Sequence, residues 1–199
     1  MTSAASSPSS STSHTLLGRV KSRDPQAWQR FADIYTPLVY SWARRAGLQE
    51  NDAADVVQEV FRTVARKLGD FGQDRSDPSF RGWLRTIARN ECRLLYRRRA
   101  NHPEVVGGSD AQQQLAELPG LDDEPTADGE AQDQHYLLHR TLKIIRDDFE
   151  ESTWSAFWRL TVDGDPAAEI GEQLGLSPAA VRQAKFRVLC RLRQELQGM

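Results

Sequence analysis

Residues 166–181 read PAAEIGEQLGLSPAAV, and this stretch decides the fold of the C-terminal part of the chain. Gly175 can take the positive φ that ends a first helix. Ser177 can cap a second helix, and Pro178 can open it. Gly171 lacks a side chain at the place where these two helices would cross closely. The stretch therefore predicts a helix-turn-helix.

The second helix of this unit carries more positive charge than an ordinary helical hairpin needs. Its basic residues are Arg182, Lys185, Arg187, Arg191 and Arg193, and Glu195 is its one acid. Side chains near the start of a recognition helix are the ones that reach base edges in the major groove of DNA. The outward positions of the unit then give the expected DNA-reading set: Ser177, Ala179, Arg182, Gln183, Phe186 and Arg187.

A second basic element lies at residues 80–99, where an arginine recurs at every fourth position. At about 100° per residue, these arginines follow one half of a helix while apolar residues fill the other half. A solvated basic face is the plain alternative, but closely spaced arginines repel each other unless an anion lies against them. We therefore expect a nucleic-acid backbone as the partner. The residues expected to contact it are Arg81, Arg85, Arg89, Asn90, Arg93, Tyr96 and Arg97.

Charge and composition divide the chain into four segments. Residues 1–14 are rich in Ser and Thr and predict a disordered tail. Residues 15–99 hold 17 basic and 10 acidic side chains. Residues 100–133 hold nine acidic side chains and no basic one, and residues 134–199 hold nine of each. Helical periodicity fills the second and fourth segments, and no stretch alternates like a strand. The prediction is an all-α protein with two small helical domains joined by a flexible acidic linker.

Several classes of protein are excluded by what the sequence lacks. No run of 18 apolar residues could form a transmembrane helix. Cys92 and Cys190 lie far apart, which excludes a disulfide framework and fits the cytoplasm. His135 and His139 have a zinc-binding spacing but no third ligand nearby, so we expect neither a metal nor another cofactor. No nucleophile set or phosphate loop indicates an enzyme.

Asp55, Gln58 and Glu59 share the outward face of a further helix, because they lie three and four residues apart. Val57 and Val60 point to the opposite, inward side. Taken alone, such a face is more often solvated than used for docking.

The segments DVVQEVF (55–61) and FRGWLRTIARN (80–90), followed by an acidic linker and a helix-turn-helix, resemble a bacterial RNA polymerase sigma factor. The two-domain layout is similar to the extracytoplasmic-function group. The resemblance covers nearly all of residues 16–196, and it rests on three motifs in this order and spacing.

This resemblance implies that core RNA polymerase and promoter DNA are the partners, and it allows an anti-sigma protein as a third. Asp55, Gln58 and Glu59 would bind the polymerase clamp. The loop at residues 69–79 and the arginine-rich helix would open and hold the −10 element, and the C-terminal domain would read the −35 element. The aromatic candidates for stacking on unpaired bases are Phe80, Trp83 and Tyr96.

The residues leave open two alternatives from other classes of protein. A stand-alone helix-turn-helix regulator would explain the C-terminal domain but would leave the arginine-rich helix and the Asp55 face unused. An enzyme acting on nucleic acid is the second alternative. The acidic linker is either a plain spacer or, as the resemblance implies, a segment that enters the RNA path of the polymerase.

Overall fold

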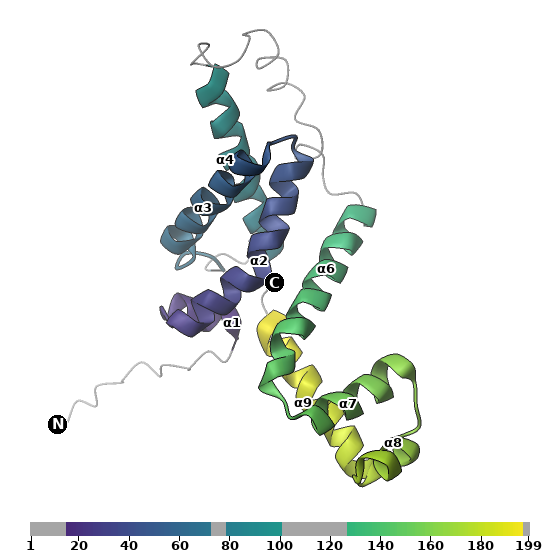
Figure 1. The fold of residues 1–199 in the computed structure, drawn as a ribbon. Coiled ribbons are helices and arrows are strands. Elements are labelled where there is room, and N and C mark those ends of the chain that lie inside the picture. Colours follow the sequence, from purple (N-terminus) through teal and green to yellow (C-terminus); the bar gives the residue numbers. More distant parts are fainter. Residues whose placement is uncertain (1–14, 73–78, 101–126, 197–199) are drawn as a thin grey trace, which may run out of the picture.

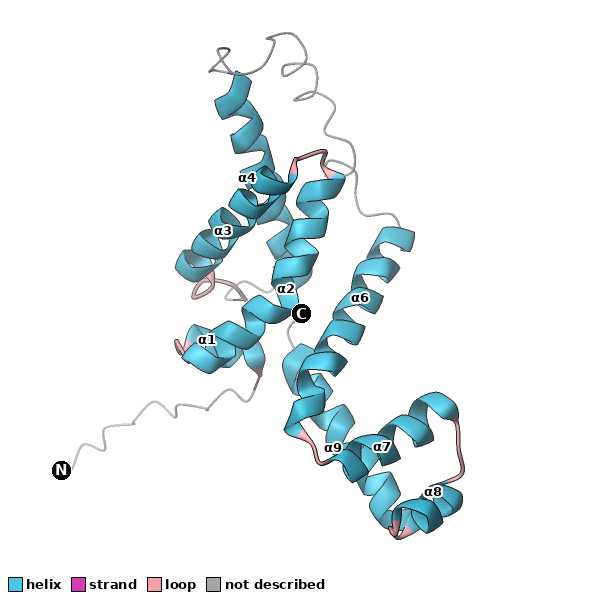
Figure 2. Ribbon diagram, in the orientation of Figure 1, coloured by secondary structure: helices cyan, strands magenta, loops and turns pink. Residues whose placement is uncertain are grey.

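A computed structural model describes residues 15–72, 79–100 and 127–196, and these form helices and turns with no strand among them (Figures 1 and 2). The predicted all-α class is therefore confirmed. No helix within the described ranges is long and apolar enough to span a bilayer. The elements are α1 (Leu16–Lys21), α2 (Pro25–Arg45), α3 (Glu50–Lys67), α4 (Phe80–Ala100), α6 (Ala127–Ile145), the 3₁₀ turn η1 (Arg146–Asp148), α7 (Glu151–Trp158), the π-helical turn η2 (Arg159–Asp163), α8 (Ala167–Leu174) and α9 (Pro178–Leu196).

Helix α2 begins sharply because its first turn is capped. Asp24 Oδ1 accepts hydrogen bonds from the backbone amides of Gln26 and Ala27 at 2.9 and 3.2 Å. Pro25 takes the first helical position, where its missing N–H costs nothing. The apolar side of α2 then packs against α3 and α4 to form the N-terminal unit (Figure 1).

Aromatic rings hold this N-terminal unit together. Phe31 is fully buried, and its ring centroid lies 4.7 Å from that of Tyr35 and 5.7 Å from that of Phe80. Phe80, at the start of α4, is likewise fully buried. Truncating a buried phenylalanine of this kind costs about 3–5 kcal/mol. The cluster therefore fixes how α4 is set against α2.

The acidic linker and the following helix differ from the sequence prediction. Residues 127–133 belong to α6, whereas the linker was expected to run to residue 133 and the helix to begin near 134. Two features favour the earlier start. Asp128 and Glu130 lie in the first turn, where negative charge suits the helix dipole, and Asp133 makes contacts with the N-terminal unit. Residues 101–126 of the predicted linker and residues 1–14 of the predicted tail lie outside the described ranges.

Helix α6 contributes to both hydrophobic cores, so the two helical units are in contact. Leu137 is buried in the core of the N-terminal unit, against which Ile144 also packs. Ile145 is buried in the second core, together with Trp154 of α7 and Val188 of α9. Figure 1 shows α6 running beside α2 and leading into the smaller group α7–α9.

The helix-turn-helix is formed by α8 and α9 as the sequence predicts. Gly175 ends α8 with φ of 67°, a left-handed value that suits glycine. Ser177 Oγ accepts a hydrogen bond from the Ala180 amide at 3.1 Å, and Pro178 opens α9. A Cβ on Gly171 would lie 2.5 Å from the backbone oxygen of Leu176. The close approach of α8 to the turn therefore needs glycine at this position.

Candidate functional site

The predicted DNA-reading surface on α9 is open to solvent. Its buried side consists of Val181, Ala184 and Val188. Phe186 is 66% exposed, which is unusual for a large aromatic side chain. The structure leaves all six predicted residues exposed: Ser177, Ala179, Arg182, Gln183, Phe186 and Arg187. A single face of the unit thus offers guanidinium, amide and aromatic groups together.

The arginine positions of α4 divide among different environments. Asn90 and Arg97 are exposed, whereas Arg81, Arg89 and Arg93 are half-buried. Four-residue steps turn the helix by about 40° each. The arginines therefore wind around α4 instead of forming one straight row.

Arg85 has only 17% of its side chain exposed. Its guanidinium faces Asp133 of α6 at 3.6 Å. Burial lowers the pKa of Arg85 from its ordinary value, although the charge of Asp133 works in the opposite direction. The expectation that Arg85 stands open to nucleic acid is therefore corrected for this conformation.

The aromatic candidates for base stacking are packed inside or against the N-terminal unit. Tyr96 is 7% exposed, and its hydroxyl donates a hydrogen bond to the carbonyl of Ala46 at 3.0 Å. Phe80 is fully buried, and Trp83 is half-buried against Phe71 and Phe80. The expectation that Tyr96 and Phe80 present open faces to bases is wrong for this structure, because both rings complete the core. Residues 73–78 of the loop expected to hold DNA lie outside the described ranges.

Asp55, Gln58 and Glu59 do lie together, and they line a hollow of about 260 Å³ between α3 and α4. Asp55 and Gln58 are exposed, while Glu59 is half-buried and ion-paired with Arg62. We name this hollow the α3–α4 groove.

The opposite wall of the α3–α4 groove comes from α4 and was not found from the sequence. Leu94 is 40% exposed there, although its position on the helical wheel places it with the apolar core residues. Glu91 lies beside it and accepts a hydrogen bond from Thr63 Oγ1 at 3.2 Å. An exposed leucine flanked by acid, amide and guanidinium groups suits a protein partner more than a nucleic acid.

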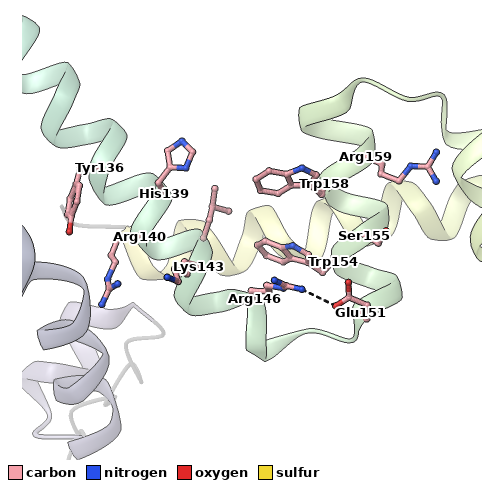
Figure 3. Close-up of a pocket in the computed structure, with 11 residues that line it drawn as sticks. Tyr136, His139, Arg140, Lys143, Arg146, Glu151, Trp154, Ser155, Trp158 and Arg159 are labelled. Carbon is pink, nitrogen blue, oxygen red and sulfur yellow. Dashed lines mark hydrogen bonds and ion pairs between the residues drawn. The ribbon is translucent and has the colours of Figure 1, made fainter.

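A larger hollow of about 690 Å³ lies between α6 and α7 (Figure 3). Trp154 and Trp158 form one wall with their rings 6.1 Å apart, and Arg146 forms an ion pair with Glu151 at its edge. His139 also lines this hollow, and its ring lies 4.3 Å from that of His135. Within the described ranges, no group of three or more His, Cys, Asp or Glu side chains is placed to hold a metal.

Ion pairs also join α2 to the C-terminal helices. Arg30 of α2 donates to Asp148 at 2.7 Å, and Arg191 of α9 donates to the same carboxylate at 2.9 Å. Burial favours a higher pKa for Asp148, but the two guanidinium groups outweigh it and hold that pKa below its ordinary value. Glu195, 1% exposed, lies 2.6 Å from Arg191. Ion pairs thus accompany the apolar contact that Leu137 makes between the two units.

Part of the chain is similar in sequence to known proteins. Residues 31–102, which run from within α2 to just beyond α4, match the family model of sigma-70 region 2. The RNA polymerase sigma factor CnrH of Cupriavidus metallidurans is 46% identical over 55 residues, which are 28% of this chain and 27% of that protein. The RNA polymerase sigma factor NccH of Alcaligenes xylosoxydans xylosoxydans is 29% identical over 119 residues, 59% of this chain and 62% of that protein.

A region 2 domain followed by a helix-turn-helix defines a class of transcription protein. Over residues 31–102 this chain is therefore similar to region 2 of the bacterial RNA polymerase sigma factors. It spans 27% and 62% of the lengths of the two relatives.

Proposed function

We propose that the protein is a transcription initiation factor that binds core RNA polymerase and directs it to promoters with specific −10 and −35 elements. The observation that carries this proposal is the presence, on one chain, of a sigma-70 region 2 match and an exposed recognition helix. In this proposal the chain contributes promoter choice, and the polymerase carries out the chemistry.

The α3–α4 groove is the proposed contact with the polymerase clamp. Asp55, Gln58 and Glu59 supply carboxylate and amide groups on one wall, and Leu94 supplies an exposed apolar group on the other. A protein–protein interface usually has an apolar centre from which water is excluded, and polar groups at its rim. An anti-sigma protein that covered the same groove would compete with polymerase.

The remaining surfaces are proposed to hold promoter DNA. On α4, the positions that the structure leaves exposed or half-buried can contact phosphates of the −10 region: Arg81, Arg89, Asn90, Arg93 and Arg97. On the helix-turn-helix, the exposed side of α9 can enter the major groove at the −35 element. Phosphate contacts set the position of the protein, and base contacts set the sequence it prefers.

Co-purification with core polymerase, followed by transcription from a promoter library, tests this function. The expected result is a stable complex that starts RNA synthesis at a defined set of promoters, while core polymerase alone does not. A gel shift with the purified chain distinguishes the stand-alone regulator. That regulator would bind duplex DNA tightly unaided, whereas a sigma factor binds promoter DNA weakly until it joins polymerase.

Substitution of Arg182 or Gln183 by Ala is expected to relax the preference for the −35 element. Both side chains are exposed on the first turns of α9, where bidentate contacts with guanine or adenine edges can form. Each lost pair should reduce discrimination between bases by about 1–3 kcal/mol. Competition binding of the polymerase complex to a set of −35 variants measures this quantity.

The matched control is Arg193→Ala near the end of the same helix. Its exposed guanidinium lies far from the start of α9, so its loss should weaken binding evenly across all sequences. If Arg182→Ala leaves the base preference unchanged, α9 does not read bases through this side chain.

A further inference from the structure

The carboxylate of Asp133 lies among three side chains of the N-terminal unit. Trp42 Nε1 donates to Asp133 Oδ2 at 2.8 Å, and Arg45 donates to Oδ1 at 2.9 Å. Arg85 faces Oδ2 at 3.6 Å, and its guanidinium carbon lies 5.9 Å from the centre of the Trp42 ring. We name Trp42, Arg45 and Arg85 the anion cradle.

The anion cradle is built by the N-terminal unit alone. Trp42 and Arg45 lie on α2, and Arg85 lies on α4 among the arginines that the sequence assigns to nucleic acid. Asp133 comes from α6, beyond residues 101–126, and is 3% exposed. Two guanidinium groups and one indole N–H therefore enclose a single negative charge brought by another part of the chain.

A phosphate oxygen of nucleic acid has the same requirements as this carboxylate. Guanidinium groups bind carboxylate and phosphate in the same forked geometry. The cradle also reaches solvent on one side, because 43% of the Arg45 side chain is exposed beside a hollow of about 450 Å³. A phosphate could not reach an ion pair that was buried on every side.

The packing of α6 on this face combines apolar and polar contacts. Leu137 is buried in the N-terminal core and Ile144 packs against it, while Tyr136 and Leu138 are 39% and 38% exposed. Arg140 donates a hydrogen bond to the backbone carbonyl of Asp33 at 3.0 Å. Units within one chain are expected to move relative to each other unless their interface is large and hydrophobic.

We propose that the anion cradle is a binding site for a backbone phosphate of nucleic acid, and that Asp133 occupies it when α6 is packed on α2. This proposal rests on the proposed function, since it adds a contact and a control to the same DNA-binding unit. Nucleic acid at the cradle and α6 in its present position exclude each other. Each therefore weakens the other by the same factor at equilibrium.

Binding of a labelled single-stranded oligonucleotide to the full-length chain tests the proposal without polymerase. Asp133→Asn keeps the shape of the side chain and removes the charge that competes with phosphate. We expect its affinity to exceed that of the unaltered chain by about 5-fold or more.

Two further variants distinguish binding at the anion cradle from a general effect of removing one negative charge. Asp128→Asn removes the same charge from an exposed position on the same helix and should leave the affinity nearly unchanged. Adding Arg85→Ala to Asp133→Asn should remove the gain. Equal effects of the two Asn variants, or a gain that survives Arg85→Ala, would overturn the proposal.

A distance measurement covers the case in which Asp133→Asn perturbs folding. Spin labels at Thr36→Cys and Gln134→Cys, in a Cys190→Ser background, report the separation of α2 and α6 at two exposed positions. Saturating oligonucleotide should lengthen this distance in the chain with native Asp133. An unchanged distance in the DNA-bound state would overturn the proposal, and it would leave co-elution with polymerase, the test of the proposed function, unaffected.

Discussion

Reversal of Asp55 and Glu59 to Lys is expected to abolish co-elution with core RNA polymerase. Both side chains line the α3–α4 groove beside the exposed Leu94. Like charges brought together in a desolvated interface cost several kcal/mol, and the second change also removes the ion pair with Arg62. Size-exclusion chromatography of the mixed proteins measures the loss, and circular dichroism should show unchanged helicity.

Reversal of Glu50 and Asp70 to Lys is the matched control for this experiment. These exposed acids lie at the start of α3 and just beyond its end, so the total charge changes equally outside the groove. Polymerase binding should persist in the control. Loss in both pairs would indicate a general charge effect, and retention in both would remove the groove as the docking surface.

Replacement of Gly171 by Ala is expected to destabilise the helix-turn-helix and with it recognition of the −35 element. Helix propensity alone predicts a gain of about 1 kcal/mol for this change. The new Cβ, however, would lie 2.5 Å from the Leu176 backbone oxygen, which no side-chain movement can relieve. Overpacking of this kind costs about 1–3 kcal/mol, so we expect the clash to exceed the propensity gain.

Chemical denaturation of the full-length chain, together with −35 binding of the polymerase complex, measures the effect. Glu172→Ala is the control, because Glu172 is the next residue of α8 and is exposed. Its free energy of unfolding should change by less than about 0.5 kcal/mol. A Gly171→Ala chain as stable as the control would show that α8 can shift away from the turn without loss.

The helix-turn-helix could be predicted because its signals are local. A left-handed Gly175, a Ser177 cap and a close crossing at Gly171 each depend on a few neighbouring residues. The exposed face of α9 follows directly from helical periodicity, since the buried residues Val181 and Val188 fix which side turns inward.

The environments of the α4 side chains could not be predicted in the same way. Helical periodicity separates an apolar half of α4 from a basic half. It does not say which neighbouring helix packs over which turn of α4. Tyr96 lies inside because Ala46 offers its carbonyl there, and Arg85 is covered because α6 packs over it. Leu94 is left 40% exposed because it lines the α3–α4 groove instead of packing in the core.

By itself, the sequence determined the helical class, the exposed face of α9 and the grouping of Asp55, Gln58 and Glu59, because spacing along a helix decides each of these. The tertiary structure alone decided that α6 begins at Ala127 and brings Asp133 to the anion cradle. That contact joins residues 91 positions apart in the chain. No local pattern encodes such a pairing, since it depends on how two separately formed helices pack.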